Sequence, residues 1–509
     1  MQSTFRSSPM LILRRMMLIV ILAFSLGFTP STIKAQTLDL QEVDRFITSL
    51  MNVYDIPGAG AAIVQNGQIL YTQGYGVRNT QTGEPVTPDT LFAIGSVTKS
   101  FTAVGIAQLV DAGLVNLDVP VVTYLPNFKL SDPGATQSVT VRQLLAQTSG
   151  LPGSDDSAWY SGRLTSLQQA VEYVAGLSLA AAPGSAHIYD NYNYAIAGYL
   201  IEQVTGQTWQ DYTHEHILQP LGMTTANFDI PTLQQTSNYA SPHLLHIREG
   251  MQPDSFVSLE GIASAGAINA SVREMANYLQ FQLGDGTFNG ESIVSAAMLN
   301  EMHTQQAAYP PMPPVGPTGF QSKGYTLGWI TADFYGYSVL WHNGSIDGFY
   351  AMMMFIPSEN AGVVVLSNAG LGIGSLFTLA ASLGLLERMI GMETGRDVVT
   401  ALNEEAAFDP ADRQAKLEAA RAYQVNPAEW TLLIGLYNGA YGQISIAEQD
   451  GKLYLDTGRR TSELVPYMPN GFLVANMPTE GLITTFTFVA NANGTITLYQ
   501  DGIEIGQKG

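Results

Sequence analysis

A serine and a lysine lie one helical turn apart at the start of an apolar segment. Ser96 and Lys99 occupy the first and fourth positions of the sequence SVTK, so on a helix their side chains share one face. A lysine that is partly removed from water has a lowered pKa and can accept the proton of a serine hydroxyl. The backbone N–H of Ser96, at a helix start, can also help to bind an oxyanion. Because Ser-x-x-Lys is common on helices, a structural role stays open for this pair alone.

A tyrosine precedes a second predicted helix. Tyr189 lies in the sequence IYDNYNYAIAGYLIE, and Asn191 follows it two residues later. A phenol held near a lysine can carry or relay a proton, and an asparagine amide can bind a substrate carbonyl. The alternative is a loop tyrosine whose ring packs on the core.

A third segment, WHNGS, ends an apolar strand. Gly344 would let a substrate lie close to the backbone, and the N–H of Ser345 would be a second oxyanion donor. His342 is a hydrogen-bonding or cationic group beside them. A single histidine at a strand end can also be purely structural.

No other catalytic pattern is present in the sequence. It contains no Gly-x-Ser-x-Gly motif of the α/β-hydrolase type and no glycine-rich phosphate-binding loop. The histidine pairs His214–His216 and His243–His246 lack the i, i+4 spacing of zinc-binding helices, and no cysteine could join them. We therefore expect no metal and no cofactor.

The composition is that of a globular protein with at least two folded units, because 509 residues exceed one ordinary core. The formal net charge of -21 argues against nucleic acid as a partner and against tight docking on an anionic membrane. The absence of cysteine excludes disulfides, thiol catalysis and a lipidated N-terminal cysteine.

Residues 1–35 have the pattern of a secretory signal peptide. Arg6, Arg14 and Arg15 precede the apolar run MMLIVILAFSLGF, and a cleavage site follows at Ala35. The alternative is an uncleaved membrane anchor, but about 13 apolar residues are fewer than the roughly 20 that span a bilayer. The sequence thus predicts a secreted or periplasmic protein that is not a lipoprotein.

The rest of the chain divides into three parts. In residues 36–394, strands are followed by a long helical middle and then by strands again, which a sheet built from both ends around a helical insert would explain. Asn66-Gly67 predicts a two-residue hairpin, and VTVRQLLAQTSGLPG predicts a helix that stops at glycine. Residues 395–423 read as a helical linker. Residues 424–509 read as a small all-β unit, a curled sheet or partial barrel.

The three segments, in this order and spacing, resemble the serine β-lactamase and penicillin-binding protein superfamily. The resemblance is closest to its class C-like branch, which includes esterases, D-amino-acid peptidases and DD-peptidases. It extends over about residues 40–390 and includes the landmarks LLAQTSGLPG, QPLGM, SAGAINAS, YTLGW and VVVLSNAG. It implies an α/β (α+β) fold: an antiparallel sheet flanked by helices with an all-helical subdomain, followed by the small all-β domain.

The resemblance also implies acyl transfer through a covalent intermediate. Ser96 would attack a carbonyl carbon, with Lys99 and Tyr189 sharing the proton transfers. The N–H groups of Ser96 and Ser345 would form the oxyanion hole, and Asn191 would orient the substrate amide. His342 would complete the catalytic set, and Gly344 would contact the substrate.

Departures from the family pattern narrow the predicted activity. β-Lactamases of this superfamily carry Lys-Thr-Gly where this chain has His342-Asn343-Gly344, and that lysine helps to hold a β-lactam carboxylate. The predicted enzyme is therefore a peptidase or esterase rather than an efficient β-lactamase. Relatives often have histidine at the position of Gln147, where we expect only a structural effect.

The predicted substrate is a small molecule or short peptide: an ester, a D-amino-acid peptide or a β-lactam. Two alternatives remain open, a penicillin-binding cell-wall sensor and a non-catalytic binding homologue, because both would keep the same motifs. The C-terminal unit resembles the lipocalin-like domains of some relatives, which points to a homo-oligomer joined through this domain.

Overall fold

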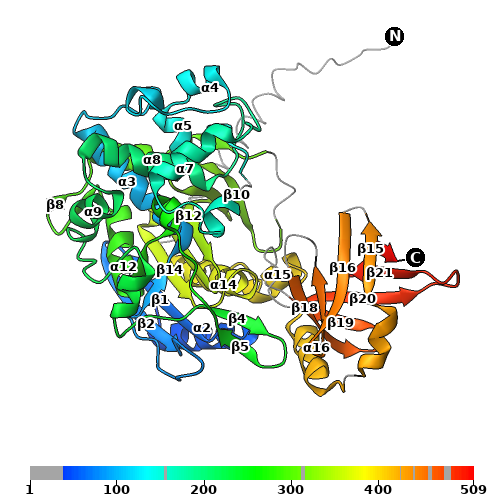
Figure 1. Ribbon diagram of the computed structural model, residues 1–509. Helices are drawn as coiled ribbons and strands as arrows, with labels where there is room; N and C mark the ends of the chain where they lie inside the picture. The colour runs from blue at the N-terminus through cyan, green and yellow to red at the C-terminus, as the bar shows by residue number, and fades with distance from the viewer. Residues whose placement is uncertain are drawn as a thin grey trace, which may run out of the picture. The chain divides into compact units, whose positions relative to one another are not determined.

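The computed structural model describes residues 38–508, apart from residues 154–156, 311–315, 425, 440–441, 457–460 and 475–482. The predicted signal peptide therefore lies outside the described residues. The described chain forms an antiparallel sheet covered by helices, a helical subdomain inserted in the sequence between its strands, and a C-terminal barrel (Figure 1). These features confirm the predicted fold class.

Eight antiparallel strands form the central sheet, in the spatial order β2-β1-β14-β13-β12-β11-β10-β9. Strands β1 and β14 come from opposite ends of the domain and pair from Ala59–Ser367 to Gln65–Ala361. This pairing confirms that the sheet is built from both ends around a helical insert. The strands are Gly58–Gln65 (β1), Gln68–Gly76 (β2), Ala307–Ala308 (β9), Phe320–Tyr325 (β10), Ile330–Phe334 (β11), Tyr337–Ile346 (β12), Phe349–Ile356 (β13) and Ala361–Ser367 (β14).

The turn between β1 and β2 is the predicted two-residue hairpin. Asn66 and Gly67 have φ angles of 52° and 72°, the left-handed values that a type I′ turn requires at both positions. Asparagine and glycine are the residues that adopt this backbone most readily, so the local sequence decides where the chain reverses.

Helices cover both faces of the sheet. Every residue of β13 and β14 is buried, and since successive side chains of a strand point to opposite faces, both faces must be covered. Helix α14 (Ile373–Ile390) packs on β13, β14 and α2 (Leu40–Tyr54), whereas α12 (Val272–Gln282) packs on β1, β2 and β14. Helix α14 is apolar and long enough to cross a membrane, but 78% of it is buried inside the protein. This burial makes it a core helix that packs on the sheet.

The helical subdomain is organised around α8 (Asn191–Thr205), which ends at Gly206 in the left-handed conformation. Its neighbours are α3 (Thr98–Asp111), α5 (Val141–Leu145), α7 (Leu167–Tyr173), α9 (Trp209–Thr213) and α11 (Ala263–Gly266). The other elements of residues 38–394 longer than one turn or paired as strands are α4 (Pro133–Ser138), α6 (Ser157–Tyr160), α10 (Ile230–Gln235), α13 (Ala296–His303), and the strand pairs Leu91–Ala93 (β3) with Asn269–Ser271 (β6), His243–His246 (β4) with Gly250–Pro253 (β5), and Thr287–Phe288 (β7) with Glu291–Ser292 (β8).

One predicted helix is much shorter than expected. The sequence predicts a helix that continues to a glycine near residue 150, but α5 ends at Leu145. Gln147 has a φ of 60°, a left-handed value that no helix interior allows. The buried contacts of the Gln147 side chain, described below, hold the backbone in this conformation.

The C-terminal strands form a closed barrel rather than a curled sheet. Eight strands pair in sequence order, and β22 closes the barrel against β15. Helices α15 (Val398–Glu405) and α16 (Pro410–Ala422) precede it, within the segment 395–423. The strands are Gly435–Gly439 (β15), Gly442–Gln449 (β16), Lys452–Asp456 (β17), Thr461–Met468 (β18), Gly471–Val474 (β19), Thr484–Ala490 (β20), Ile496–Gln500 (β21) and Ile503–Lys508 (β22).

Candidate active site

Ser96 lies in a single 3-10 turn, η1 (Gly95–Val97), that leads directly into α3. Its side chain is partly exposed, whereas Lys99, one turn later, is fully buried. A reactant can therefore reach the hydroxyl while the amine is shielded from water. Burial of a lysine disfavours its charged form unless neighbouring groups compensate.

Three oxygen atoms surround the Lys99 amine. Its Nζ lies 2.9 Å from Ser96 Oγ, 2.8 Å from Asn191 Oδ1 and 2.9 Å from the carbonyl oxygen of Ala265. The amide and carbonyl oxygens can only accept hydrogen bonds. A neutral amine has two hydrogens and one lone pair, so when the hydrogens go to these two acceptors the lone pair faces Ser96 Oγ. This arrangement suits proton transfer from the serine to the lysine.

Aromatic rings border the same amine. Lys99 Nζ lies 4.8 Å from the ring centroid of Tyr189 and 5.7 Å from that of Tyr194. Both distances are within the range of cation–π attraction, so the rings stabilise the ammonium that forms when Lys99 takes a proton. The Tyr194 hydroxyl donates to the carbonyl oxygen of Leu145, which fixes α8 against α5.

A buried network fixes the segment that carries Tyr189 and Asn191. Asp190 is the N-cap of α8, and its carboxylate accepts from the N–H groups of Tyr192 and Gly153. Gln147 Oε1 in turn accepts from the Asp190 N–H at 3.0 Å and from Asn193 Nδ2 at 2.6 Å. Gln147 thus helps to hold the segment that carries Tyr189 and Asn191.

The backbone of β12 crosses η1 at van der Waals contact. A Cβ added to Gly344 would lie 1.8 Å from the Ile94 carbonyl oxygen and 3.0 Å from Ser96 N, and one added to Gly95 would lie 2.9 Å from Ser345 N. Both positions must therefore be glycine for the two segments to approach. The crossing brings the N–H groups of Ser96 and Ser345 to one place, as an oxyanion hole requires.

His342 is buried in β12 and is neutral. Burial, followed by the charge of Lys99, lowers the pKa of His342 to about 3. Its Nδ1 lies 2.6 Å from the Asn343 carbonyl oxygen, so Nδ1 carries the hydrogen and Nε2 accepts from the Tyr325 hydroxyl at 2.9 Å. Burial holds the pKa of Tyr325 well above its ordinary value, which keeps that hydroxyl protonated. The hydrogen-bonding role proposed from the sequence fits this geometry, whereas the cationic alternative does not.

The structure brings all the predicted site residues to one place, but through different contacts. Hydrogen bonds join Ser96, Lys99 and Asn191, and ring contacts join Tyr189 to Lys99 and to His342, whose ring centroid is 6.3 Å away. Gly344 and Ser345 enter through the backbone crossing.

Sequence reasoning missed three groups of this site: the Ala265 carbonyl, the Tyr194 ring and the Tyr325 hydroxyl. Two of them lie in segments that carry the family resemblance, SAGAINAS and YTLGW. A backbone carbonyl has no signature in the residue type, so only the segment, and not the atom, could be found from the sequence.

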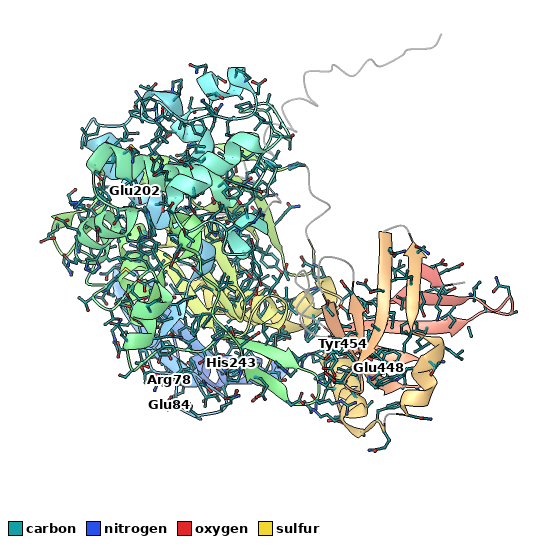
Figure 2. All side chains as sticks on the ribbon, viewed as in Figure 1. Arg78, Glu84, Glu202, His243, Glu448 and Tyr454 are labelled. Carbon is teal, nitrogen blue, oxygen red and sulfur yellow. The ribbon has the colours of Figure 1, made fainter. Side chains whose placement is uncertain are left out.

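His243, from one of the histidine pairs, is labelled in Figure 2 and has a structural role. It is fully buried, its Nε2 accepts from the Thr80 N–H at 3.1 Å, and burial lowers its pKa to about 4. The residues that the structure describes contain no group of three or more His, Asp or Glu side chains arranged to hold a metal ion.

A family model described as Beta-lactamase matches residues 43–385. This range contains all the predicted site residues and ends before the C-terminal barrel begins.

Two curated proteins show the extent of sequence similarity. Protein flp of Staphylococcus aureus (strain NCTC 8325 / PS 47) is 30% identical over 336 residues, which are 64% of this chain and 63% of that protein. The match thus spans less than two thirds of the staphylococcal protein. Unguisins hydrolase ungD' of Aspergillus campestris (strain IBT 28561) is 27% identical over 465 residues, 85% of this chain and 84% of that protein.

Solved structures show the same fold. The octameric penicillin-binding protein homologue from Pyrococcus abyssi aligns with a TM-score of 0.59 and 25% identity over 92% of this chain and all of that one. A class C beta lactamase from Rhodobacter sphaeroides aligns with a TM-score of 0.55 and 20% identity over 68% of this chain and 99% of that one. At this identity, the second match is evidence for the fold alone.

Proposed function

Because the chain belongs to the beta-lactamase family, we propose that it is a serine hydrolase that cleaves an ester or amide bond through an acyl-enzyme on Ser96. The observation that carries the proposal is the buried Lys99 amine, which lies 2.9 Å from Ser96 Oγ beside two groups that only accept hydrogen bonds, Asn191 Oδ1 and the Ala265 carbonyl oxygen. Once deprotonated, the amine can give its hydrogens to these acceptors and turn its lone pair to Ser96 Oγ. The hydrolase among the similar curated proteins supports the same reaction class.

In the proposed reaction, Ser96 Oγ attacks the substrate carbonyl carbon and its proton passes to Lys99 Nζ. The N–H groups of Ser96 and Ser345 stabilise the oxyanion of the tetrahedral intermediate. As the intermediate collapses, the bond to the leaving group breaks, and Tyr189 delivers a proton to that group and regains one from the Lys99 ammonium. Water then attacks the acyl carbon and gives a proton to Lys99. When the bond to Ser96 Oγ breaks, that proton passes to the serine oxygen, which releases the acid and restores the hydroxyl.

We propose a peptidase or esterase activity rather than efficient β-lactam hydrolysis. The position where lactamases carry a lysine holds His342, which is neutral because its pKa is lowered to about 3. A neutral imidazole whose nitrogens already bond Asn343 and Tyr325 offers no positive charge to a β-lactam carboxylate.

We also propose that the protein is exported, on the basis of the leader pattern in residues 1–35. A second proposal is that it forms a homo-oligomer. The octameric assembly named for the Pyrococcus abyssi homologue supports the second point, since that alignment covers 92% of this chain. Exposed apolar side chains on and beside the barrel, Leu432, Leu436 and Ile503, are candidates for subunit contacts. Light scattering coupled to size-exclusion chromatography measures the oligomeric state directly. A monomer at micromolar concentration would contradict the proposed homo-oligomer.

The test of the enzymatic proposal is intact-protein mass spectrometry of the exported chain mixed with p-nitrophenyl butyrate and, separately, with a penicillin. We expect rapid nitrophenol release with a transient adduct that is absent from Ser96→Ala. A stable penicillin adduct with little turnover would instead indicate a penicillin-binding sensor. Equal behaviour of the wild type and Ser96→Ala with both reagents would contradict the proposal and favour a non-catalytic binding protein.

A further inference from the structure

We propose that an apolar cavity beside Ser96 receives the side chain of the acyl group, so that the enzyme prefers acyl groups ending in an uncharged aromatic ring. This inference rests on the proposed acyl-enzyme and adds the substrate class that it accepts. The cavity has a volume of about 210 Å³, and its apolar walls include Phe228, Ile230, Phe256, Leu259, Ile346 and Phe349.

The cavity lies next to the segments that carry the proposed reacting groups. Its wall includes Gly266, whose added Cβ would lie 3.9 Å from the carbonyl carbon of Gly95, the residue before Ser96. Gly266 also directly follows Ala265, whose carbonyl holds Lys99. On the other side, Ile346 directly follows Ser345 in β12. A carbonyl bound between Ser96 and Ser345 is therefore within one residue of the cavity wall.

The part of β12 that lines the cavity indicates which half of the substrate enters the cavity. His342, Gly344 and Ile346 alternate with their neighbours and so share the face of the strand that meets η1. His342 contacts the Tyr189 ring, which places the leaving group, protonated by Tyr189, at that end. Ile346 lies four residues further on, about 13 Å along a strand, and lines the cavity. The cavity therefore faces the acyl half of the substrate.

Its size and lining match an aromatic ring. A cavity of roughly 150 Å³ with apolar walls is enough to bind benzene, so the space here holds a phenyl group with its linking methylenes. Burial of such a group is favourable in proportion to the apolar area removed from water. Phe256 and Phe349 lie with ring centroids 6.0 Å apart at the wall, a spacing at which an inserted ring can contact both.

The charges around the cavity exclude an acidic acyl group. Among the residues that the structure describes, the charged side chains of the lining are Asp229, Glu260 and Asp347, and none of the lining side chains is lysine, arginine or histidine. Asp229 caps α10, and Asp347 accepts from the Tyr160 hydroxyl, so both already have structural partners. A carboxylate in this cavity would lose its hydration and meet only like charge.

The experiment compares p-nitrophenyl esters that share one leaving group: the acetate, the 3-phenylpropanoate and the 3-(4-carboxyphenyl)propanoate. Each kcat/KM is divided by the rate constant of spontaneous hydrolysis of the same ester. We expect the phenylpropanoate to exceed the acetate by about tenfold or more, since buried apolar groups discriminate to this extent. We expect the carboxylated ester to fall by about tenfold or more below the phenylpropanoate, because its ring carries the excluded charge.

A pair of serine variants tests whether the preference for the phenylpropanoate ester arises in this cavity. Ser258 is exposed and lines the cavity, whereas Ser255 is exposed on the same segment and is not among the lining residues. Ser258→Phe should lower the phenylpropanoate-to-acetate ratio of kcat/KM by about tenfold, because the new ring fills the space that an inserted ring needs. Ser255→Phe should keep the ratio within about twofold of the wild type, since nothing in the cavity changes.

The outcomes separate the two proposals. Turnover of all three esters that depends on Ser96 but shows no preference for the phenylpropanoate, or a preference for the carboxylated ester, overturns the cavity assignment and leaves the hydrolase intact. A phenylpropanoate-to-acetate ratio of kcat/KM that is unchanged in Ser258→Phe also overturns the cavity assignment and leaves the hydrolase proposal intact. If Ser96→Ala releases nitrophenol as fast as the wild type, the hydrolase proposal fails and the cavity assignment fails with it. The wild-type series decides the question even if Ser258→Phe does not fold.

Discussion

At the scale of single residues, the proposed chemistry depends on the oxygen atoms that lie within hydrogen-bond distance of the Lys99 amine. Its amine is buried among Ser96 Oγ, Asn191 Oδ1 and the Ala265 carbonyl oxygen, of which only the serine hydroxyl can give a proton. In the proposed reaction, the same contacts would hold the deprotonated lysine in position to take the serine proton. Preorganisation of this kind avoids reorganisation during the reaction.

Replacement of this base should remove most of the activity. Lys99→Met keeps the length of the side chain but removes the lone pair, so we expect kcat/KM for p-nitrophenyl butyrate to fall by about 10³-fold. Lys129→Met, at an exposed position outside the site, is the matched control and should retain normal rates. A Lys99→Met enzyme with more than a tenth of the wild-type rate would mean that another group takes the serine proton.

The phenol of Tyr189 gives a second prediction. Tyr189→Phe keeps the ring beside Lys99 and removes only the hydroxyl, so turnover should fall by about 10²-fold or more if the phenol transfers a proton. Tyr335→Phe removes a hydroxyl from an exposed ring and should leave turnover unchanged. Near-normal turnover in Tyr189→Phe would limit its role to packing against the amine.

At the scale of elements, the site is a crossing between a strand and a turn. Strand β12 passes so close to η1 that neither Gly344 nor Gly95 has space for a side chain. In the proposed reaction, this short distance would bring two backbone N–H groups, from segments about 250 residues apart in the chain, to the same carbonyl oxygen.

A single methyl group tests this crossing. In Gly344→Ala the new Cβ would lie 1.8 Å from the Ile94 carbonyl oxygen, so β12 must move away from η1. Loss of one oxyanion donor lowers kcat by about 10²-fold to 10³-fold, and we expect a decrease of this size in steady-state kinetics. Gly176→Ala is the matched control, because nothing lies within 4 Å of its added Cβ. A normal kcat in Gly344→Ala would show that the crossing does not form the oxyanion hole.

At the scale of the whole molecule, the fold brings together segments that are far apart in the chain and buries their polar groups. His243 and His342 are both buried and neutral, with pKa values lowered by burial to about 4 and about 3. In the unfolded chain each returns to about 6.5. Between these values the unfolded chain binds more protons than the folded protein, so the free energy of unfolding decreases as the pH falls from about 6.5 towards 4.

This dependence is measurable without enzyme activity. In urea denaturation at pH 7.5, 6.0 and 5.0, the urea concentration at the midpoint of unfolding should become lower as the pH falls. The midpoint of His243→Gln should fall less steeply with decreasing pH than that of the wild type, because one buried group no longer takes up a proton on unfolding. His246→Gln, at an exposed position of the same strand pair, serves as the control and should keep the wild-type slope. Equal slopes for all three proteins would contradict the lowered pKa of His243.

Features set by neighbouring residues could be predicted from the sequence. The Asn66-Gly67 turn, the glycine that ends α8 and the capping box of Ser271 and Glu274 all depend on contacts within a few residues. The prediction of a helix that runs towards Gly150 was wrong, because this backbone depends on residues far away in the chain. Gln147 is held in a left-handed conformation by bonds to Asp190 and Asn193, more than 40 residues away.

The sequence by itself determined the chemistry of this protein: a serine and a lysine at helical spacing, a tyrosine before a helix and a glycine at a strand end. The tertiary structure alone decided how these groups meet. It placed the Ala265 carbonyl on Lys99, kept His342 neutral, closed the barrel and opened an apolar cavity beside Ser96. The reason is physical: side-chain type and spacing follow from neighbouring residues, whereas burial, backbone acceptors and cavities arise from segments that only the folded chain brings together.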